Sequence, residues 1–224
     1  MVATPFWPAV IVGLALAFGA GCARPAAAPP SAEALVIAFV DDFHSGVIVA
    51  RERVPAWVWP RQAADPWLVL HFGERRWISG EAHGVLPALR LAFTGGEGGV
   101  QIDCVSWWRH RRGGTDPDAV RLWVFTVSRD EEAALVRCLL AWIEAREPPG
   151  ELWTGGRWWV STRPWTLFSN CHDFTAELLA AAGIVVERPP IMQAAPLRAA
   201  LDRAWAARQA RGEGAVARPA RAAH

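Results

Sequence analysis

The residue with the clearest chemical potential is Cys171, which lies where a polar loop meets an apolar segment expected to form a helix over residues 174–182. Unpaired backbone N–H groups and the positive end of the helix dipole favour a thiolate at such a position. We therefore expect the helix start to lower the pKa of Cys171 and make its sulfur a nucleophile. The competing interpretation is an inert core cysteine, because apolar burial raises the pKa of a thiol.

A nucleophilic cysteine needs a base close to its sulfur. The candidate base is His44, which lies at the head of the β-branched run Gly46-Val47-Ile48-Val49. A histidine at a strand end can also be an exposed surface residue with no chemical role. If His44 serves as the base, the fold must bring an early strand beside the start of a late helix.

The base in turn needs a polar group that holds its ring in position. His71 is the candidate, because it is the polar residue that follows the apolar run 67–70, and Glu74 is the second choice. Strand alternation leaves open whether His71 shares a face with Val69. His71 could also be a core histidine whose hydrogen bonds are satisfied locally.

The polar residues around Cys171 have a simpler explanation than catalysis. His172 and Asp173 fit the first turn of a helix, where polar groups satisfy the unpaired backbone amides. The backbone N–H of Cys171, with a neighbouring donor, is expected to stabilise an oxyanion.

A zinc site is the competing interpretation of these histidines and cysteines. Cys171, His172, His44 and His71 could be combined into a ligand set, but the sequence has no Cys-x-x-Cys or His-Glu-x-x-His spacing. Adjacent helix residues such as Cys171 and His172 also project in different directions. We therefore expect neither a metal nor another cofactor.

Two further cysteines, Cys104 and Cys138, have no place in this chemistry. They could form a disulfide in an oxidising compartment or remain buried thiols, and we favour thiols.

The N-terminal residues are expected to direct the chain to a membrane. An apolar core over residues 10–18 is followed by Gly19-Ala20-Gly21 and then Cys22, which resembles a bacterial lipoprotein signal that is cleaved before a lipidated Cys22. An uncleaved anchor helix is the alternative, although the apolar run is marginal for the roughly 20 residues of a bilayer span. Both alternatives place the domain on the periplasmic side of a bacterial membrane.

Composition divides the rest of the chain into one domain with two extensions. The chain has 224 residues and a net charge of +1, which suits a single globular domain and gives no basic surface for nucleic acid. We expect a signal peptide over residues 1–22, a flexible linker over 23–33, one α+β domain over 34–208 and a disordered, arginine-containing tail over 209–224.

Hydrophobic patterning predicts the elements of this domain. A capping box at Ser128 introduces the most strongly indicated helix, and Gly183 is a suitable C-terminal residue for the cysteine helix. The segment 152–161 has no pattern that fixes its conformation. The expected strands are 34–40, 44–50, 66–72 with a continuation over 75–79, 99–107, 119–127 and a short strand 184–186; the expected helices are 84–93, 130–147, 174–182 and 194–208.

The order of these motifs resembles a known superfamily. His44 ahead of its strand, with Asn170-Cys171-His172-Asp173-Phe174 far downstream, resembles the circularly permuted branch of the NlpC-type papain-like proteins, which includes lecithin retinol acyltransferase-like proteins. More closely, the N-terminus, the strand 68–73 and the segments 166–171 and 180–184 are similar to a family of bacterial lipoproteins of unknown function. The resemblance covers roughly residues 35–200. It implies a papain-like domain with a mainly antiparallel sheet packed by the cysteine helix and other helices.

The resemblance also implies a function. It suggests a lipid-anchored periplasmic cysteine hydrolase or acyltransferase, amidase-like or peptidase-like, that forms an acyl-enzyme at Cys171 with help from His44 and His71. The expected partners are the membrane and a cell-envelope substrate, either a peptidoglycan peptide or a lipid acyl group. The alternatives are a catalytically inactive envelope-binding lipoprotein on the same scaffold, and a structural or assembly partner.

Overall fold

The structure is a computed structural model that describes residues 33–59, 65–81, 85–105, 120–144, 149–151, 156–187 and 194–213. The expected signal segment with Cys22, the linker up to residue 32 and the end of the tail from residue 214 lie outside the described residues. The first strand begins at Glu33 and the last helix ends at Ala210, close to the domain limits expected from the sequence.

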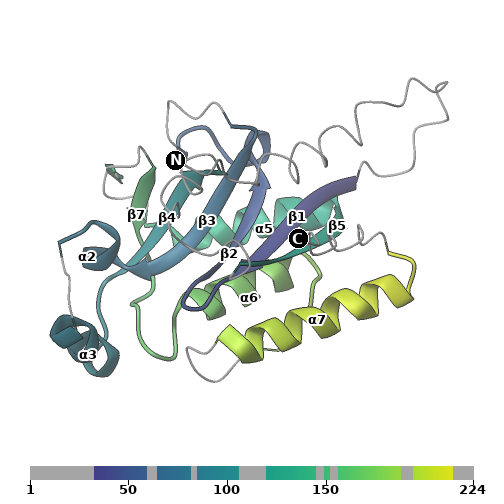
Figure 1. The fold of residues 1–224 in the computed structure, drawn as a ribbon. Coiled ribbons are helices and arrows are strands. Elements are labelled where there is room, and N and C mark those ends of the chain that lie inside the picture. The colour runs from purple at the N-terminus through teal and green to yellow at the C-terminus, as the bar shows by residue number, and fades with distance from the viewer. Residues whose placement is uncertain are drawn as a thin grey trace, which may run out of the picture.

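The described part of the chain has an α+β fold built on an antiparallel sheet of seven strands (Figure 1). The strand order is β5-β1-β2-β3-β4-β7-β6, and every pairing is antiparallel. The strands are β1 (Glu33–Val40), β2 (Ser45–Ala50), β3 (Trp67–Glu74), β4 (Gly98–Cys104), β5 (Arg121–Ser128), β6 (Gly150–Glu151) and β7 (Arg157–Val160); the helices are the short η1 (Arg51–Arg53), α2 (Arg75–Ile78), α3 (Val85–Thr94), α5 (Arg129–Trp142), α6 (Cys171–Ala181) and α7 (Ala194–Ala210).

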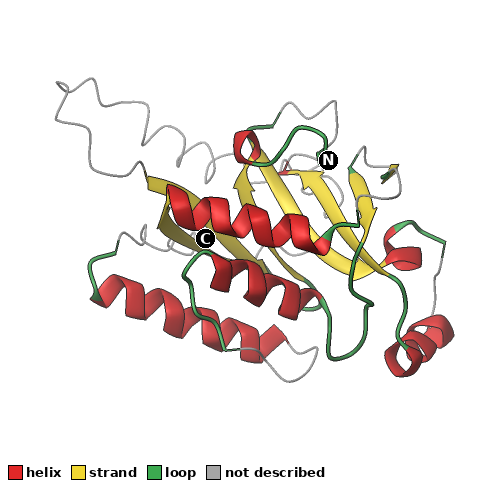
Figure 2. Cartoon of the chain, turned by 180° about the vertical axis from the view of Figure 1, so that it is seen from behind, coloured by secondary structure: helices red, strands yellow, loops and turns green. Residues whose placement is uncertain are grey.

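Three helices cover one face of this sheet. Figure 2 shows α5, α6 and α7 on the same side, where α6 packs on β2 and β3 and the other two pack towards β1 and β5. Alternate strand residues such as Val47, Leu70 and Phe72 enter the main core beneath these helices. A smaller cluster around Phe39 and Val69 lies on the opposite face. The side on which a strand residue points therefore decides whether it can meet α6.

An aromatic cluster fixes α6 against the sheet. The Phe174 ring lies 5.9 Å from Phe72 of β3 and 5.1 Å from Trp142 of α5, and Phe72 and Trp142 are 4.8 Å apart. Phe72, Trp142 and Phe174 are buried, and aromatic pairs of this kind add about 0.5–1.5 kcal/mol each beyond their buried area. Phe174 lies one helical turn after Cys171, so the cluster also holds the start of the helix in place.

Strand β1 carries the chain from one end of the sheet to the other. It runs from Glu33 to Val40 and delivers the chain to the turn Asp41–His44, after which β2 returns antiparallel. Gly46 in β2 is required for this packing, because a Cβ there would lie 2.2 Å from the Leu70 carbonyl oxygen and 2.6 Å from the Phe39 ring. The turn that bears His44 is thereby fixed at the far end of β1.

Helices α2 and α3 lie beyond the end of β3, to one side of the three covering helices (Figure 1). The expected continuation of the strand over residues 75–79 is wrong, because Glu74 caps a short helix by accepting a hydrogen bond from the Trp77 amide at 2.9 Å. The chain returns from α3 through Gly95, whose φ of 70° suits glycine. These elements therefore form a separate corner of the domain.

The structure confirms some of the expected helix and strand ends and corrects others. The capping box at Ser128 and the positive φ of Gly183 are present. Helix α5 ends at Trp142 rather than near residue 147, because Ile143 leaves the helix to bridge Ser161. Residues 184–186 form no strand, and β4 stops at Cys104.

None of the described helices is long and apolar enough to span a bilayer. Cys104, Cys138 and Cys171 are not joined to one another by disulfides.

Candidate functional site

The start of α6 is built by a reciprocal cap. Asn170 Oδ1 accepts a hydrogen bond from the His172 amide at 2.8 Å, and Asp173 Oδ2 accepts one from the Asn170 amide at 3.2 Å. Asn170 also donates from Nδ2 to the Leu167 carbonyl oxygen at 2.9 Å. These bonds make Cys171 the first residue of the helix and confirm the expected helix-start role of Asp173.

The sulfur of Cys171 lies against the turn between β1 and β2. Its Sγ is 3.8 Å from the Phe43 carbonyl oxygen and 3.7 Å from His172 Nδ1. Only 5% of the residue is exposed to solvent. The fold thus brings the start of the cysteine helix to the turn that carries His44, which the expected pairing of Cys171 with His44 requires.

Burial determines the protonation of this sulfur. It raises the pKa of Cys171 to about 11, although the Ser45 amide, the Ser45 hydroxyl and the Cys171 amide all act to lower it; the charge of Asp41 acts in the same direction as burial. The expectation that the helix start lowers this pKa is therefore wrong, because the loss of solvation outweighs three hydrogen-bond donors. Cys171 is a neutral thiol at neutral pH.

A buried hydroxyl network joins β2 to the first turn of α6. The Ser45 hydroxyl donates to the Cys171 carbonyl oxygen at 3.0 Å and lies 2.9 Å from both His172 Nδ1 and Thr175 Oγ1. Thr175 also donates to the Cys171 carbonyl oxygen, at 2.8 Å. The network ties the backbone of Cys171 to the strand that follows His44.

The sequence analysis missed Ser45 and Thr175. Both have signals in the sequence: Ser45 is the polar residue on the core-facing side of β2, and Thr175 follows Cys171 by four residues, which places the two on one helix face.

His172 is a neutral, buried imidazole. Burial, together with the nearby charge of His44, lowers its pKa to about 4 against an opposing effect of Asp41. Nδ1 contacts Ser45, while Nε2 is buried without a hydrogen-bond partner among the described residues. A base this weak is poorly matched to proton transfer at neutral pH.

His44 occupies a well-defined turn. Asp41 Oδ1 accepts hydrogen bonds from the Phe43 amide at 2.7 Å and the His44 amide at 2.6 Å, and the Asp41 amide donates to the His44 carbonyl oxygen at 2.9 Å. The His44 side chain is exposed, in contrast to that of His172. It is close enough to affect the His172 pKa electrostatically, so both imidazoles belong to one site.

His71 is not beside the sulfur. Its partners in the ladder are Gly46 and Gln101, and its ring meets Phe39 edge-on at 5.0 Å, on the same face as Val69. Helix α6 lies on the other face, so the sheet separates His71 from Cys171. The pairing with Gly46 places His71 two residues from His44 along the β2 register.

Glu74 has a different task from the one considered in the sequence. It is buried at the end of β3, where it caps α2. It also lines a pocket between α2 and α3.

Two exposed aromatic side chains flank the site. Phe43 belongs to the turn that contacts the sulfur, and Phe168 belongs to the turn from Thr166 to Ser169 that leads into α6; they are 78% and 79% exposed. Aromatic side chains this exposed, on the segments that precede His44 and Cys171, offer apolar contact to a ligand.

The described residues contain no group of three or more histidine, cysteine, aspartate or glutamate side chains placed to hold a metal ion.

Comparisons with protein-family models, with curated proteins and with solved structures find no match to this chain.

Proposed function

We propose that this protein is a lipid-anchored periplasmic cysteine hydrolase or acyltransferase that acts on an amide or ester of the cell envelope. The observation that carries the proposal is the position of the Cys171 sulfur, at the first residue of α6 and 3.8 Å from the carbonyl oxygen next to His44. We further propose that Cys22 carries the lipid and that the chain has a circularly permuted papain-like fold. The order of strands and cysteine helix supports this last point.

In the proposed reaction Cys171 attacks the substrate carbonyl carbon. A C–S bond forms while the thiol proton passes to the His44 imidazole; the bond to the amine or alcohol then breaks, and the imidazolium returns the proton to that leaving group. Water or a second acceptor releases the acyl group from the thioester. The Cys171 amide, at the first residue of α6, is the proposed donor for the oxyanion.

The neutral state of the thiol means that the proposed reaction needs a base. Because the pKa of Cys171 is about 11, proton transfer has to accompany the attack rather than precede it. His172, with a pKa of about 4, is too weak a base, whereas His44 is exposed at the turn beside the sulfur and is the base that we propose. His71, on the neighbouring strand, is the proposed orienting residue for His44.

The same burial favours the second candidate, a catalytically inactive envelope-binding protein on this scaffold. A cysteine that is 5% exposed with a raised pKa is also what a structural thiol requires.

Acylation by an activated ester separates the two candidates. Full-length protein is treated with p-nitrophenyl acetate and p-nitrophenyl decanoate, and the modified residue is identified by peptide mass spectrometry. The enzyme predicts a burst of p-nitrophenol and a thioester on Cys171 that is lost in Cys171→Ala, slowed in His44→Ala and unchanged in the control Cys138→Ala. Acylation of the wild type no faster than that of Cys171→Ala would leave only the binding protein.

A further inference from the structure

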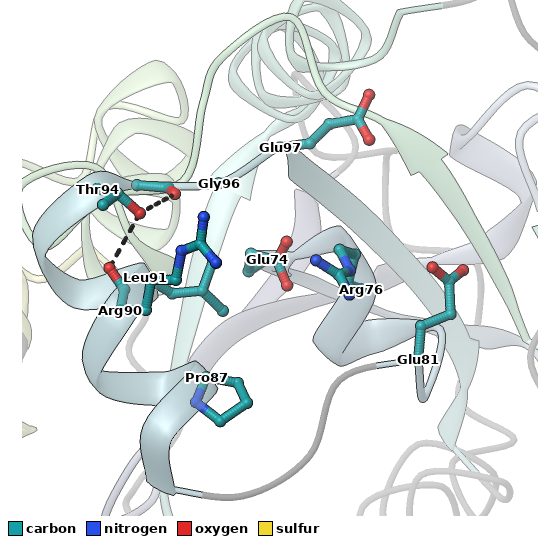
Figure 3. A pocket seen from close by; sticks show the side chains of 10 residues that line it. Glu74, Arg76, Glu81, Pro87, Arg90, Leu91, Thr94, Gly96 and Glu97 are labelled. Atoms are coloured by element: carbon teal, nitrogen blue, oxygen red, sulfur yellow. Dashed lines mark hydrogen bonds between the residues drawn. The ribbon is translucent and has the colours of Figure 1, made fainter.

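A second site lies outside the Cys171 network, in the corner formed by α2 and α3. A pocket of about 640 Å³ opens there between the two helices and the loop that precedes β4 (Figure 3). Its lining is rich in charge, with Arg76 and Arg90 on opposite sides of Glu74. None of the residues of the Cys171 network lines it.

The floor of this pocket is a buried carboxylate. Glu74 is 4% exposed, and its hydrogen bonding within the described residues consists of one bond, from the Trp77 amide to Oε2. Gly96 leaves room for it, because a Cβ at that position would lie 2.6 Å from Glu74 Cγ and 2.9 Å from Oε1. Burial of a carboxylate costs free energy unless it is paired, so a partner for Oε1 is expected from the pocket.

The two arginines of the pocket, Arg76 and Arg90, are exposed, and neither forms an ion pair within the described part of the chain. The remaining acidic residues of the rim, Glu81 and Glu97, are both paired with Arg75 instead. The pocket therefore presents two guanidinium groups and one carboxylate that have no charged partner among the residues that the structure describes.

We propose that this pocket binds a small zwitterion, a ligand with an ammonium and a carboxylate group of the α-amino-acid or short-peptide type. Glu74 Oε1 receives the ammonium, and Arg76 and Arg90 bind the carboxylate, for which the planar guanidinium is suited. The Trp77 amide leaves Glu74 Oε1 available, so capping of α2 and ligand binding do not compete. This binding does not depend on the reactivity of Cys171.

The pocket is connected to the cysteine helix by backbone pairing. Gly96 and Trp165 exchange two hydrogen bonds of 2.9 Å, and the turn from Thr166 to Ser169 follows directly before the Asn170 cap. A bound zwitterion would therefore lie next to Gly96, which pairs with the segment that leads to Cys171. If the protein is the cysteine enzyme proposed above, this position suits recognition of a charged end of its substrate.

The test measures binding of defined probes to the full-length protein by isothermal titration calorimetry. The zwitterions are alanine and alanylalanine, and the single-charge controls are propionate, ethylamine and inorganic phosphate. Because each charge-assisted hydrogen bond to a buried group contributes about tenfold or more, at least one zwitterion should bind at least tenfold more tightly than each control. Equal binding of propionate, tighter binding of phosphate, or no binding of either zwitterion would overturn the proposal.

Three substitutions in the pocket and two controls outside it locate the site. Glu74→Gln keeps an acceptor for the Trp77 amide, so α2 stays capped, but zwitterion affinity should fall at least tenfold. Arg76→Gln and Arg90→Gln should each weaken binding, while Arg137→Gln, which changes an exposed arginine of α5 outside the pocket, should not. Affinity unchanged by Glu74→Gln would refute the assignment, and Cys171→Ala with full binding would keep this result independent of the enzymatic proposal.

Discussion

The alkylation rate of Cys171 should follow an unusually alkaline pH profile. Its pKa rises from an ordinary value of 9.0 to about 11 on burial, a shift of two units. At pH 7 the thiolate fraction is then about 10⁻⁴ instead of about 10⁻², so alkylation should be about 100-fold slower than in the unfolded chain before any steric protection. The same shift corresponds to about 3 kcal/mol of stability that is lost as the pH rises from 9 towards 11, because the unfolded state releases its proton first.

The assay is iodoacetamide labelling between pH 7 and pH 11.5, resolved by peptide mass spectrometry so that each cysteine is followed separately. Cys104, whose pKa burial also raises to about 11, is an internal comparison, and the urea-unfolded chain supplies the reference rate. Ser45→Ala removes a hydroxyl that lowers the pKa of Cys171, and its labelling should be roughly tenfold slower still, since hydrogen bonds to charged groups contribute about 1.5–3 kcal/mol.

A native midpoint at or below pH 9 would refute this reasoning. It would mean that the helix start and the Ser45 donors outweigh the loss of solvation. Faster labelling of Ser45→Ala at constant stability would likewise show that the hydroxyl does not stabilise the thiolate.

Three further substitutions test other parts of the structure. The pKa of His172 is about 4 rather than 6.5, so the wild type should lose about 3 kcal/mol between pH 6.5 and pH 4; urea unfolding should show a smaller loss in His172→Gln, and equal losses would contradict a buried neutral ring. Phe174→Ala should cost about 3–5 kcal/mol in the same assay because it empties the aromatic cluster, whereas a cost below about 1 kcal/mol would mean that the site has collapsed to fill the space. Ser128→Ala should cost about 1 kcal/mol by removing the α5 cap, and an unchanged unfolding midpoint would argue against that cap.

Local patterns predicted much of the fold because most of its strands have one strongly apolar face. The runs around Val36, Val47 and Leu70 became β1, β2 and β3, and the Ser128 box became the start of α5. The meeting of the Cys171 and His44 segments was also predicted, although from the resemblance and not from local pattern. The antiparallel pairing of β1 and β2 explains how it occurs.

The chemistry of the site could not be predicted in the same way, because it depends on tertiary burial. The position of Cys171 at a helix start suggested a low pKa, but the depth at which β2 covers the sulfur is not encoded in its neighbours. The face taken by His71 depended on a register without a bulge. Glu74 became a helix cap because the chain turns sharply at Arg75, where a continued strand was expected.

The length of β1 contributes to the distance between Cys171 and the point where the chain would be tethered. Eight residues separate the entry at Glu33 from the turn at Asp41, a rise of roughly 26 Å at 3.3 Å per residue. If Cys22 carries the lipid, as proposed, a fully extended chain of ten residues adds at most about 35 Å. In such a protein the turn beside Cys171 could lie up to about 60 Å from the bilayer surface. That distance would allow contact with material well above the lipid headgroups.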